Sequence, residues 1–418
     1  MPDGSGAASA EDISGSGATA VLLEAVAGLS RRFGSDPEYT RGGGGNSSAK
    51  AAGIVYIKAS GRSLATLTAA ELMPLRMEPL LELLEGGGEG ETAGPGTDEI
   101  MRVALAARIN PADDRRPSVE CLFHALLPEP IVLHTHPTVA NSLTCAIEGE
   151  QIATEILGDD VLWVPYVDPG LPLARRIAAG RRAYVARTGR SAPRAILLQN
   201  HGMIVSGEST DEVASGCDRI VEAVRRRLEG AWSASVEPEA RDWSSAPATI
   251  PILTAAFREL LAEEDRPTIV LFDDSPAALE IASTAVGRQL VDGGPLTPDQ
   301  IVYTGSWPLW IEATGSGDAE AIQRTLRDRL DGHVAKTGAT PSVVVVGGLG
   351  VLIVAGSERF AATAREVLLD AMRVVQGASA FGGVRVLAPD ERRFIEEWEA
   401  EAYRRGVETA SPVAGGTA

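Results

Sequence analysis

The sequence is poor in cysteine and in long apolar runs, and each shortage excludes a class of protein. Cys121, Cys145 and Cys217 stand far apart in a chain of 418 residues, so no disulfide framework is expected and a reducing, cytoplasmic compartment is favoured. No apolar run reaches the roughly 18 residues of a membrane-spanning helix. The first residues also lack the basic start and apolar core of a signal peptide. We therefore expect no membrane partner.

Basic residues are in the minority as well. The chain has 38 Lys and Arg against 57 Asp and Glu, which gives a formal net charge of -19 at pH 7. Affinity for nucleic acid comes largely from clustered Lys and Arg, whereas the arginines here are scattered among acids. We expect no nucleic-acid partner.

The length and the 44% apolar content predict two domains, since the chain is too long for one ordinary domain and can build two cores. The two ends of the chain have few apolar residues to bury. The stretch at 233–251 is rich in Ser, Pro and charge, which is typical of a linker. The expected organisation is a disordered lead at 1–18, a first domain at 19–232, a linker at 233–251, a second domain at 252–405 and a disordered tail at 406–418.

Local patterns indicate mixed helices and strands. From about residue 19, AVLLEAVAGLSRRFG has apolar residues at helical spacing and closes at Gly34. In the second domain, strand-like TIVLFDD and SVVVVGGLGVLIVAG alternate with helical segments, which predicts an α/β unit. GGLGVLIVAG lacks the third glycine of a dinucleotide fingerprint and is interpreted as strand, turn and strand.

Only five histidines occur, and four of them fall between positions 124 and 201. In IVLHTHP, His134 and His136 would project from the same face of a strand. His201 stands between two apolar runs in AILLQNHGMIVSG. Three neutral imidazoles with an open fourth position describe a catalytic zinc site. The alternative is that the strand histidines are ordinary, partly buried polar groups; His124 is interpreted as structural.

A carboxylate precedes this cluster in RPSVECLFHALLPEP. The segment predicts a short helix with Ser118 as its cap and Glu120 in its first turn. Glu120 is either a solvated first-turn carboxylate, a fourth group at the metal, or a general acid/base.

Two further segments are candidates for contact with an anion. In GGGGNSS, glycines let backbone N–H groups approach closely, and Asn46 and Ser47 can add donors. Lys58, Ser60 and Gly61 in YIKASG could complete a phosphate or carboxylate pocket at a strand end. The alternative is a flexible glycine loop.

GGGGNSS, YIKASG, PSVE, HTHP and LLQNHG, in this order over about 160 residues, resemble the class II aldolase/adducin family. The resemblance is closest to the aldolase portion of bifunctional rhamnulose-1-phosphate aldolase/short-chain dehydrogenase proteins. GPLTPDQIVYTGSWPLWI, SVVVVGGLGVLIVAG and FIEEWEAEAYRR resemble the part that follows the aldolase domain in those proteins. The resemblance implies an α/β/α sandwich with a central mixed or antiparallel sheet, followed by a second, smaller α/β domain.

By that resemblance, His134, His136 and His201 would bind a divalent metal, most often Zn²⁺ and otherwise Mn²⁺, Co²⁺ or Mg²⁺. Glu120 would be the catalytic acid/base. The phosphate pocket would be lined by Gly45, Asn46, Ser60, Gly61 and Ser118. Two departures stand out: Val119 replaces a second phosphate-binding serine of the fuculose-phosphate aldolases, with Lys58 as the candidate substitute, and the sequence carries no dehydrogenase module.

The implied activity is that of a metal-dependent aldolase. It would cleave or form the C3–C4 bond of a ketose 1-phosphate such as rhamnulose 1-phosphate, giving dihydroxyacetone phosphate and an aldehyde. The alternatives are a metal-dependent sugar-phosphate epimerase, dehydratase or decarboxylase of the same family, or a non-catalytic adducin-like binding protein. Glutamate in PSVE favours the aldolases over the epimerases. The expected partners are a small-molecule sugar phosphate or aldehyde and further copies of the chain in a homo-oligomer.

Overall fold

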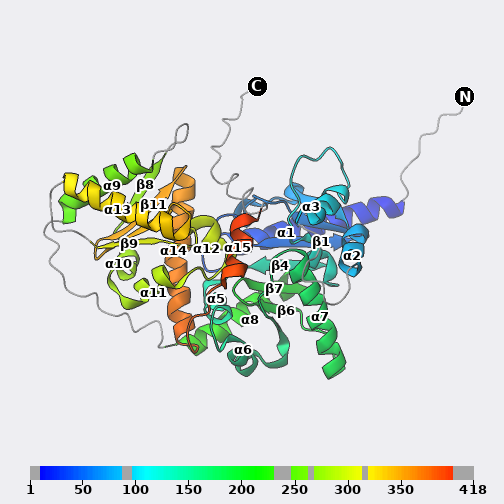
Figure 1. Ribbon diagram of the computed structural model, residues 1–418. Coiled ribbons are helices and arrows are strands. Elements are labelled where there is room, and N and C mark those ends of the chain that lie inside the picture. The colour runs from blue at the N-terminus through cyan, green and yellow to red at the C-terminus, as the bar shows by residue number, and fades with distance from the viewer. Residues whose placement is uncertain (1–9, 87–96, 230–245, 262–267, 313–318, 399–418) are drawn as a thin grey trace, which may run out of the picture. The chain divides into compact units, whose positions relative to one another are not determined.

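The computed structural model (Figure 1) describes most of the chain. The described residues are 10–86, 97–229, 246–261, 268–312 and 319–398. Helix α1 spans Ala10–Gly34 and so takes in part of the expected disordered lead. Helix α9, Ala246–Leu260, likewise begins within the expected linker. Residues 1–9 and the expected tail lie outside the described residues.

The chain forms two compact units whose residues interleave along the sequence. The first takes its residues from Met1–His136, Asp159–Leu197 and Met203–Ile220, and the second from Pro137–Gly158, Leu198–Gly202 and Val221–Ala418. The boundaries expected from the sequence stay a prediction.

The first unit is built on a seven-stranded sheet with the order β3-β2-β1-β4-β7-β6-β5. Its strands are β1 (Asn46–Ala51), β2 (Ile54–Lys58), β3 (Leu72–Arg76), β4 (Ile131–Thr135), β5 (Val161–Val164), β6 (Ala195–Leu198) and β7 (Gly202–Gly207). Strand β4 lies between β1 and β7 and is antiparallel to both. This order places the end of the glycine-rich turn and the strand that carries His134 side by side.

Helices cover both faces of this sheet. Ser47 on β1 accepts a hydrogen bond from Ser30 on α1, whereas the hydroxyl of Ser48 bonds Nδ1 of His124 on α4 (Cys121–Leu126). Successive strand residues face opposite sides, so α1 and α4 lie on opposite faces. The first unit also contains α2 (Met77–Glu85), α3 (Thr97–Ala106), α7 (Leu171–Thr188) and the first part of α8 (Thr210–Leu228). The α/β/α sandwich expected from the resemblance is confirmed.

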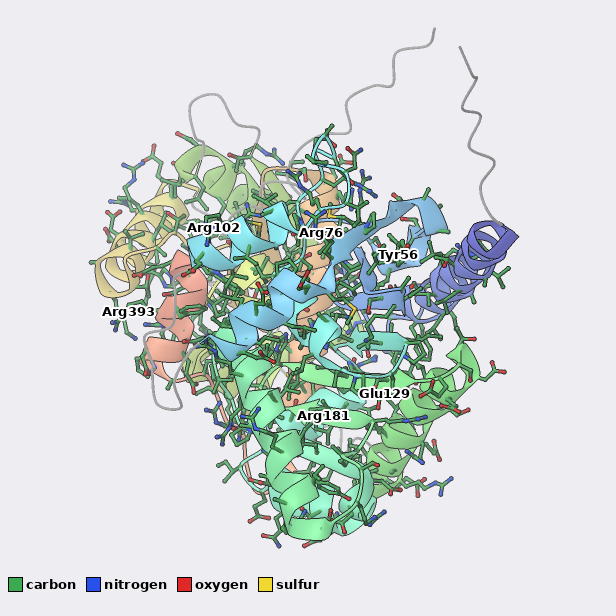
Figure 2. All side chains as sticks on the ribbon, turned by 90° about the vertical axis from the view of Figure 1, so that its right-hand side faces the viewer. Tyr56, Arg76, Arg102, Glu129, Arg181 and Arg393 are labelled. Carbon is green, nitrogen blue, oxygen red and sulfur yellow. The ribbon has the colours of Figure 1, made fainter. Side chains whose placement is uncertain are left out.

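The buried carboxylate of Glu129 in the first unit is paired with a cation. The carboxylate of Glu129, 7% exposed, lies 3.9 Å from Arg181 and accepts a hydrogen bond from Ser206; Figure 2 labels the acid and the arginine. Burial lowers the pKa of Lys50 to about 8, and the charges of Glu129 and Arg181 act on it in opposite directions. Removing one member of such a set would leave an uncompensated buried charge.

The second unit contains a four-stranded mixed sheet with the order β8-β11-β10-β9. Its strands are β8 (Ile269–Asp273), β9 (Leu309–Glu312), β10 (Val343–Gly347) and β11 (Gly350–Ala355). Strand, turn and strand are therefore confirmed for GGLGVLIVAG. Gly350 has φ +138°, and a Cβ there would lie 2.3 Å from the carbonyl oxygen of Asp273. The close approach of β8 accounts for this glycine.

Alternate valines of β10 face two helical layers. Val343 and Val345 pack with α10 (Pro276–Ser283), α11 (Ala285–Gly293), α12 (Pro298–Thr304) and α14 (Glu358–Ser379). Val344 and Val346 pack with α9 and α13 (Ala319–Thr337). All four valines are fully buried, which is worth about 1.5–3 kcal/mol each. The remaining helices of the unit are α5 (Thr138–Thr144), α6 (Gly149–Leu157) and α15 (Pro389–Glu397). The expected second α/β unit is confirmed, and its sheet is smaller than that of the first unit.

The three cysteines lie in the interior of the protein. All three cysteines are buried and free, and burial raises the pKa of Cys121 and Cys145 to about 12. Among the residues whose placement is described, no helix combines the length and apolar character that crossing a membrane requires.

Candidate metal centre

Two of the three candidate ligands stand at the end of β4. His134 is fully buried within the strand, and His136 follows it. The backbone N–H of His136 donates to the carbonyl of Tyr39 at 2.9 Å, which fixes the chain as it leaves the sheet. The two rings meet with their Nε2 atoms 3.0 Å apart. The same-face placement predicted from H-x-H is thus present.

The protonation of His134 follows from its other ring nitrogen. Nδ1 lies 2.9 Å from the carbonyl oxygen of Met203 on β7. A carbonyl oxygen can only accept, so Nδ1 carries a proton, and Nε2 is the nitrogen that offers a lone pair when the ring is neutral. Histidines that bind metals are held in this way by a second hydrogen bond.

The third imidazole comes from the turn between β6 and β7. The backbone N–H of His201 donates to Leu198 at 3.1 Å, and the side chain is 7% exposed. Ligand atoms of His134, His136 and His201 all lie within 4.8 Å of one another. Nitrogen–metal bonds are about 2.0–2.1 Å long, so two donors on one ion lie at most about 4.2 Å apart, a limit that the Nε2 atoms of His134 and His136 meet. Three nitrogen donors, one of them with a fixed lone pair, fit a divalent metal ion.

Glu120 reaches this cluster from the start of α4. It occupies the N-cap position, which the sequence assigned to Ser118, and its side chain makes no capping bond. Oε1 lies 3.4 Å from Nε2 of His134, and the carboxylate is 14% exposed. Oε2 accepts a hydrogen bond of 2.8 Å from Asn46. Glu120 is therefore not a solvated first-turn group.

Asn46 connects the glycine turn to the same place. It pairs with His134 across the antiparallel β1–β4 register, and residues directly opposite face the same side. Its Nδ2 donates to Ser118 and Glu120, both at 2.8 Å. Its Oδ1 is buried and has no hydrogen-bond partner within the described part of the chain. Such an oxygen costs roughly 1–3 kcal/mol, so a ligand hydroxyl that donates to it would be favoured.

The other candidates for the anion pocket are tied to this region by backbone contacts. Nζ of buried Lys58 donates to the carbonyls of Arg62 at 2.7 Å and Gly43 at 3.3 Å. The N–H of Ser60 donates to Arg116 at 3.0 Å, two residues before Ser118. Gly61 has φ +75°. Their part in binding phosphate stays a prediction.

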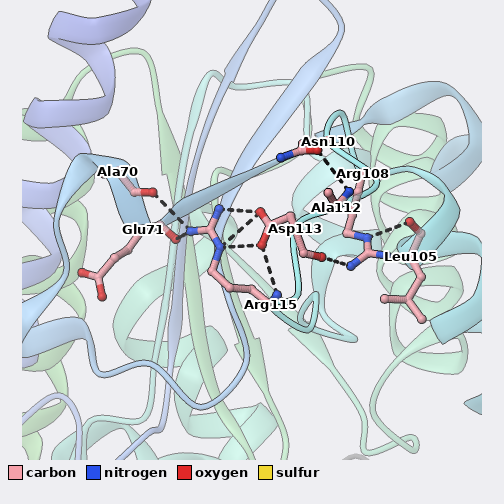
Figure 3. A network of polar contacts seen from close by, with 8 residues as sticks. All are labelled: Ala70, Glu71, Leu105, Arg108, Asn110, Ala112, Asp113 and Arg115. Carbon is pink, nitrogen blue, oxygen red and sulfur yellow. Dashed lines mark hydrogen bonds and ion pairs between the residues drawn. The ribbon is translucent and has the colours of Figure 1, made fainter. Parts of the chain in front are cut away.

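An ion pair holds the segment that leads to Ser118 (Figure 3). Nη2 of Arg115 lies 2.6 Å from Oδ2 of Asp113, and Nη1 donates to two carbonyls of η2 (Ala69–Glu71) at 3.2 and 3.0 Å. The hydrogen bond from Arg115 lowers the pKa of Asp113. This pair fixes the approach to Glu120.

Sequence reasoning missed the residues that orient the candidate ligands. Met203 acts through its backbone carbonyl, which no side-chain pattern reveals. Asn200, directly before His201, has φ +54°. The available signal was an asparagine at the junction of two apolar runs, since Asn adopts left-handed conformations more readily than most residues.

Replacing Gly45 with alanine should weaken the metal centre. Gly45 has φ +73°, and a Cβ there would lie 2.7 Å from the carbonyl oxygen of His134. We expect metal affinity to fall about tenfold or more, as for changes around other metal ligands, when measured by equilibrium dialysis. Gly53→Ala is the matched control, because Gly53 has φ +76° but open space at the Cβ position. Equal metal affinities in the two variants would contradict the prediction.

Comparison with known proteins supports one family. The model of the class II aldolase and adducin N-terminal domain matches residues 24–228, and the model of the second domain of class II aldolases matches residues 244–337. A curated Bacillus subtilis (strain 168) protein, named "Uncharacterized oxidoreductase YuxG", is 26% identical over 417 residues. The match covers 91% of this chain and 58% of that protein, so the chain spans less than two thirds of the relative's length.

Solved structures of the family are also similar. The N-terminal class II aldolase domain of a conserved Thermoplasma acidophilum protein is 26% identical, covering 49% of this chain and 93% of that chain with a TM-score of 0.42. An L-fuculose 1-phosphate aldolase from Glaciozyma antarctica PI12 is 16% identical, covering 56% of this chain and 80% of that chain with a TM-score of 0.34. With both domain models matched in order, the chain belongs to the class II aldolase and adducin family.

Proposed function

We propose that the protein is a metal-dependent aldolase that cleaves or forms the C3–C4 bond of a ketose 1-phosphate such as rhamnulose 1-phosphate. The products of cleavage would be dihydroxyacetone phosphate and an aldehyde. The observation that carries the proposal is the Glu120 carboxylate, 3.4 Å from Nε2 of His134 beside the three-imidazole cluster. An acid/base next to a metal site is what this carbon–carbon cleavage requires.

His134, His136 and His201 would hold the ion, and Zn²⁺ suits three imidazoles well. When bound, it supplies the positive charge that stabilises electrons released onto a substrate oxygen as the bond breaks. The carbonyl of Met203 bonds Nδ1 of His134, so Nε2 of that ring points away from β7.

Glu120 would carry a proton on Oε1 and transfer it to and from the substrate carbon. Asn46 binds Oε2 and so fixes the direction of the carboxylate. Backbone groups around Gly45, the hydroxyls of Ser60 and Ser118, and the cation of Lys58 would bind the phosphate, with Asn46 and Gly61 beside them. We also propose that the protein forms a homo-oligomer, as expected from the resemblance.

A retro-aldol assay tests the proposal. A panel of ketose 1-phosphates is incubated with zinc-loaded and chelator-treated protein, and dihydroxyacetone phosphate and aldehyde are quantified. We expect both products in equal amounts from at least one substrate, loss of activity on chelation, and recovery with zinc. Carbon dioxide without aldehyde would instead indicate a decarboxylase, and an interconverted sugar phosphate would indicate an epimerase. Protein that binds no metal would support the adducin-like alternative.

A further inference from the structure

The residue before His201 has an unusual backbone conformation. Among the described non-glycine residues only Ala52 and Asn200 have positive φ. Ala52 is exposed in the β1–β2 turn, whereas Asn200 is fully buried. A strained conformation of this kind persists only where surrounding groups determine it. The bonds around Asn200 therefore decide where the His201 turn lies.

The side-chain amide of Asn200 is hydrogen-bonded through both its nitrogen and its oxygen. Nδ2 donates to the carbonyls of Leu296 and Arg385, both at 2.8 Å. Oδ1 accepts from Nη1 of Arg385 at 2.5 Å, and the backbone N–H donates to Thr144 at 3.0 Å. Leu296 and Arg385 follow 96 and 185 positions later in the chain. The turn is thus held by the C-terminal part of the second unit.

Arg385 is itself fixed. Nη2 lies 2.8 Å from Oε1 of Glu391, whose other oxygen accepts from the N–H of Ala388 at 2.7 Å. The backbone N–H of Arg385 donates to Cys145 at 2.8 Å. Charge-assisted hydrogen bonds with defined geometry are among the stronger ones in proteins. The guanidinium of Arg385 therefore holds the side-chain oxygen of Asn200 in place.

A second contact also joins a segment next to a candidate ligand to the C-terminal part of the chain. Thr138, two residues after His136, donates from its hydroxyl to Asp370 on α14, and α5 packs along α14. Segments next to two of the three imidazoles are therefore anchored to the C-terminal part of the chain.

We propose that Asn200 and Arg385 are positioning residues of the metal centre, through which the C-terminal part of the chain sets the place of His201. The inference rests on the proposed metal-dependent function, and Asn200, His201 and Arg385 all belong to the second unit. Groups that orient a metal ligand typically change metal affinity 10- to 100-fold when removed. Losing either side chain should have an effect of about this size.

The test is a titration of the metal-free, full-length protein with Co²⁺, followed by its visible absorption, and with Zn²⁺ in competition. Asn200→Gly keeps the positive φ accessible but removes the side-chain bonds, and Arg385→Met removes the guanidinium. We expect each to weaken Co²⁺ binding about 10- to 100-fold and to alter the visible spectrum. The double variant should be no weaker than either single variant, because the two residues act as a unit.

Two further variants complete the design. Arg385→Lys keeps one donor for the Asn200 oxygen and should give intermediate affinity, which preserves the test if Arg385→Met does not fold. Arg288→Met, which removes an exposed ion pair with Asp292 in the same unit, should bind Co²⁺ normally. Normal affinity and spectrum in Asn200→Gly and Arg385→Lys would overturn the positioning role alone. Failure of the unaltered protein to bind either metal would overturn the proposed function together with this inference.

Discussion

Replacing Glu120 with glutamine should abolish turnover while the metal content stays unchanged. The amide has the shape of the carboxylate, and its oxygen can still accept the hydrogen bond from Asn46. It cannot carry the proton that the reaction transfers, so we expect kcat to fall by a factor of about 10²–10⁴. The measurement is dihydroxyacetone phosphate release on the best substrate of the panel, with metal per chain determined by mass spectrometry.

The matched control is Glu155→Gln, on the exposed side of α6, where the carboxylate accepts a hydrogen bond from Gln151. That variant should keep full activity. A fully active Glu120→Gln protein would remove this residue from the mechanism. Loss of metal from Glu120→Gln would show instead that the carboxylate is a fourth group at the ion, the reading that the sequence left open.

Two of the three candidate metal ligands could be brought together from the sequence because their signal is local. An apolar run before H-x-H predicts a strand with two imidazoles on one face, and the Nε2 atoms of His134 and His136 are 3.0 Å apart. The nearness of His201 depends on the β4–β7 pairing. That pairing joins distant segments and has no local pattern, so the sequence could offer His201 only as the third imidazole of a possible zinc site and through the family resemblance.

Other features could not be predicted because they arise from long-range contacts. The glycine turn was interpreted through its freedom to bind an anion, yet Gly45 is also required by the carbonyl of His134 opposite it. Ser118 reads as a cap, but its hydroxyl bonds Asn46 and the N–H of Glu120, which takes the cap position. The bond between Asn200 and Arg385 spans 185 positions, and no periodicity connects them.

Replacing any one of His134, His136 and His201 with alanine should remove both the metal and the activity. Each ring contributes a share of a binding free energy that reaches about 10–16 kcal/mol in small zinc domains, so affinity should fall by about a hundredfold or more. Thermal unfolding gives a readout independent of turnover. An ion that binds only the folded state at a hundred times its Kd stabilises by about 2.7 kcal/mol, and zinc should therefore raise the Tm of the unaltered protein but not of the variants.

Two other histidines separate metal binding from general effects on the fold. His333→Ala, on α13 and half-buried, should keep the metal, the activity and the zinc-dependent rise in Tm. His124→Ala should lower the Tm, because His124 is fully buried, bonds Ser48 and stacks on Phe123, yet zinc should still raise that lower Tm. If His124→Ala abolished the zinc effect while His201→Ala preserved it, the ion would have to be held by a different set of imidazoles from the one that the β4 end and the β6–β7 turn bring together.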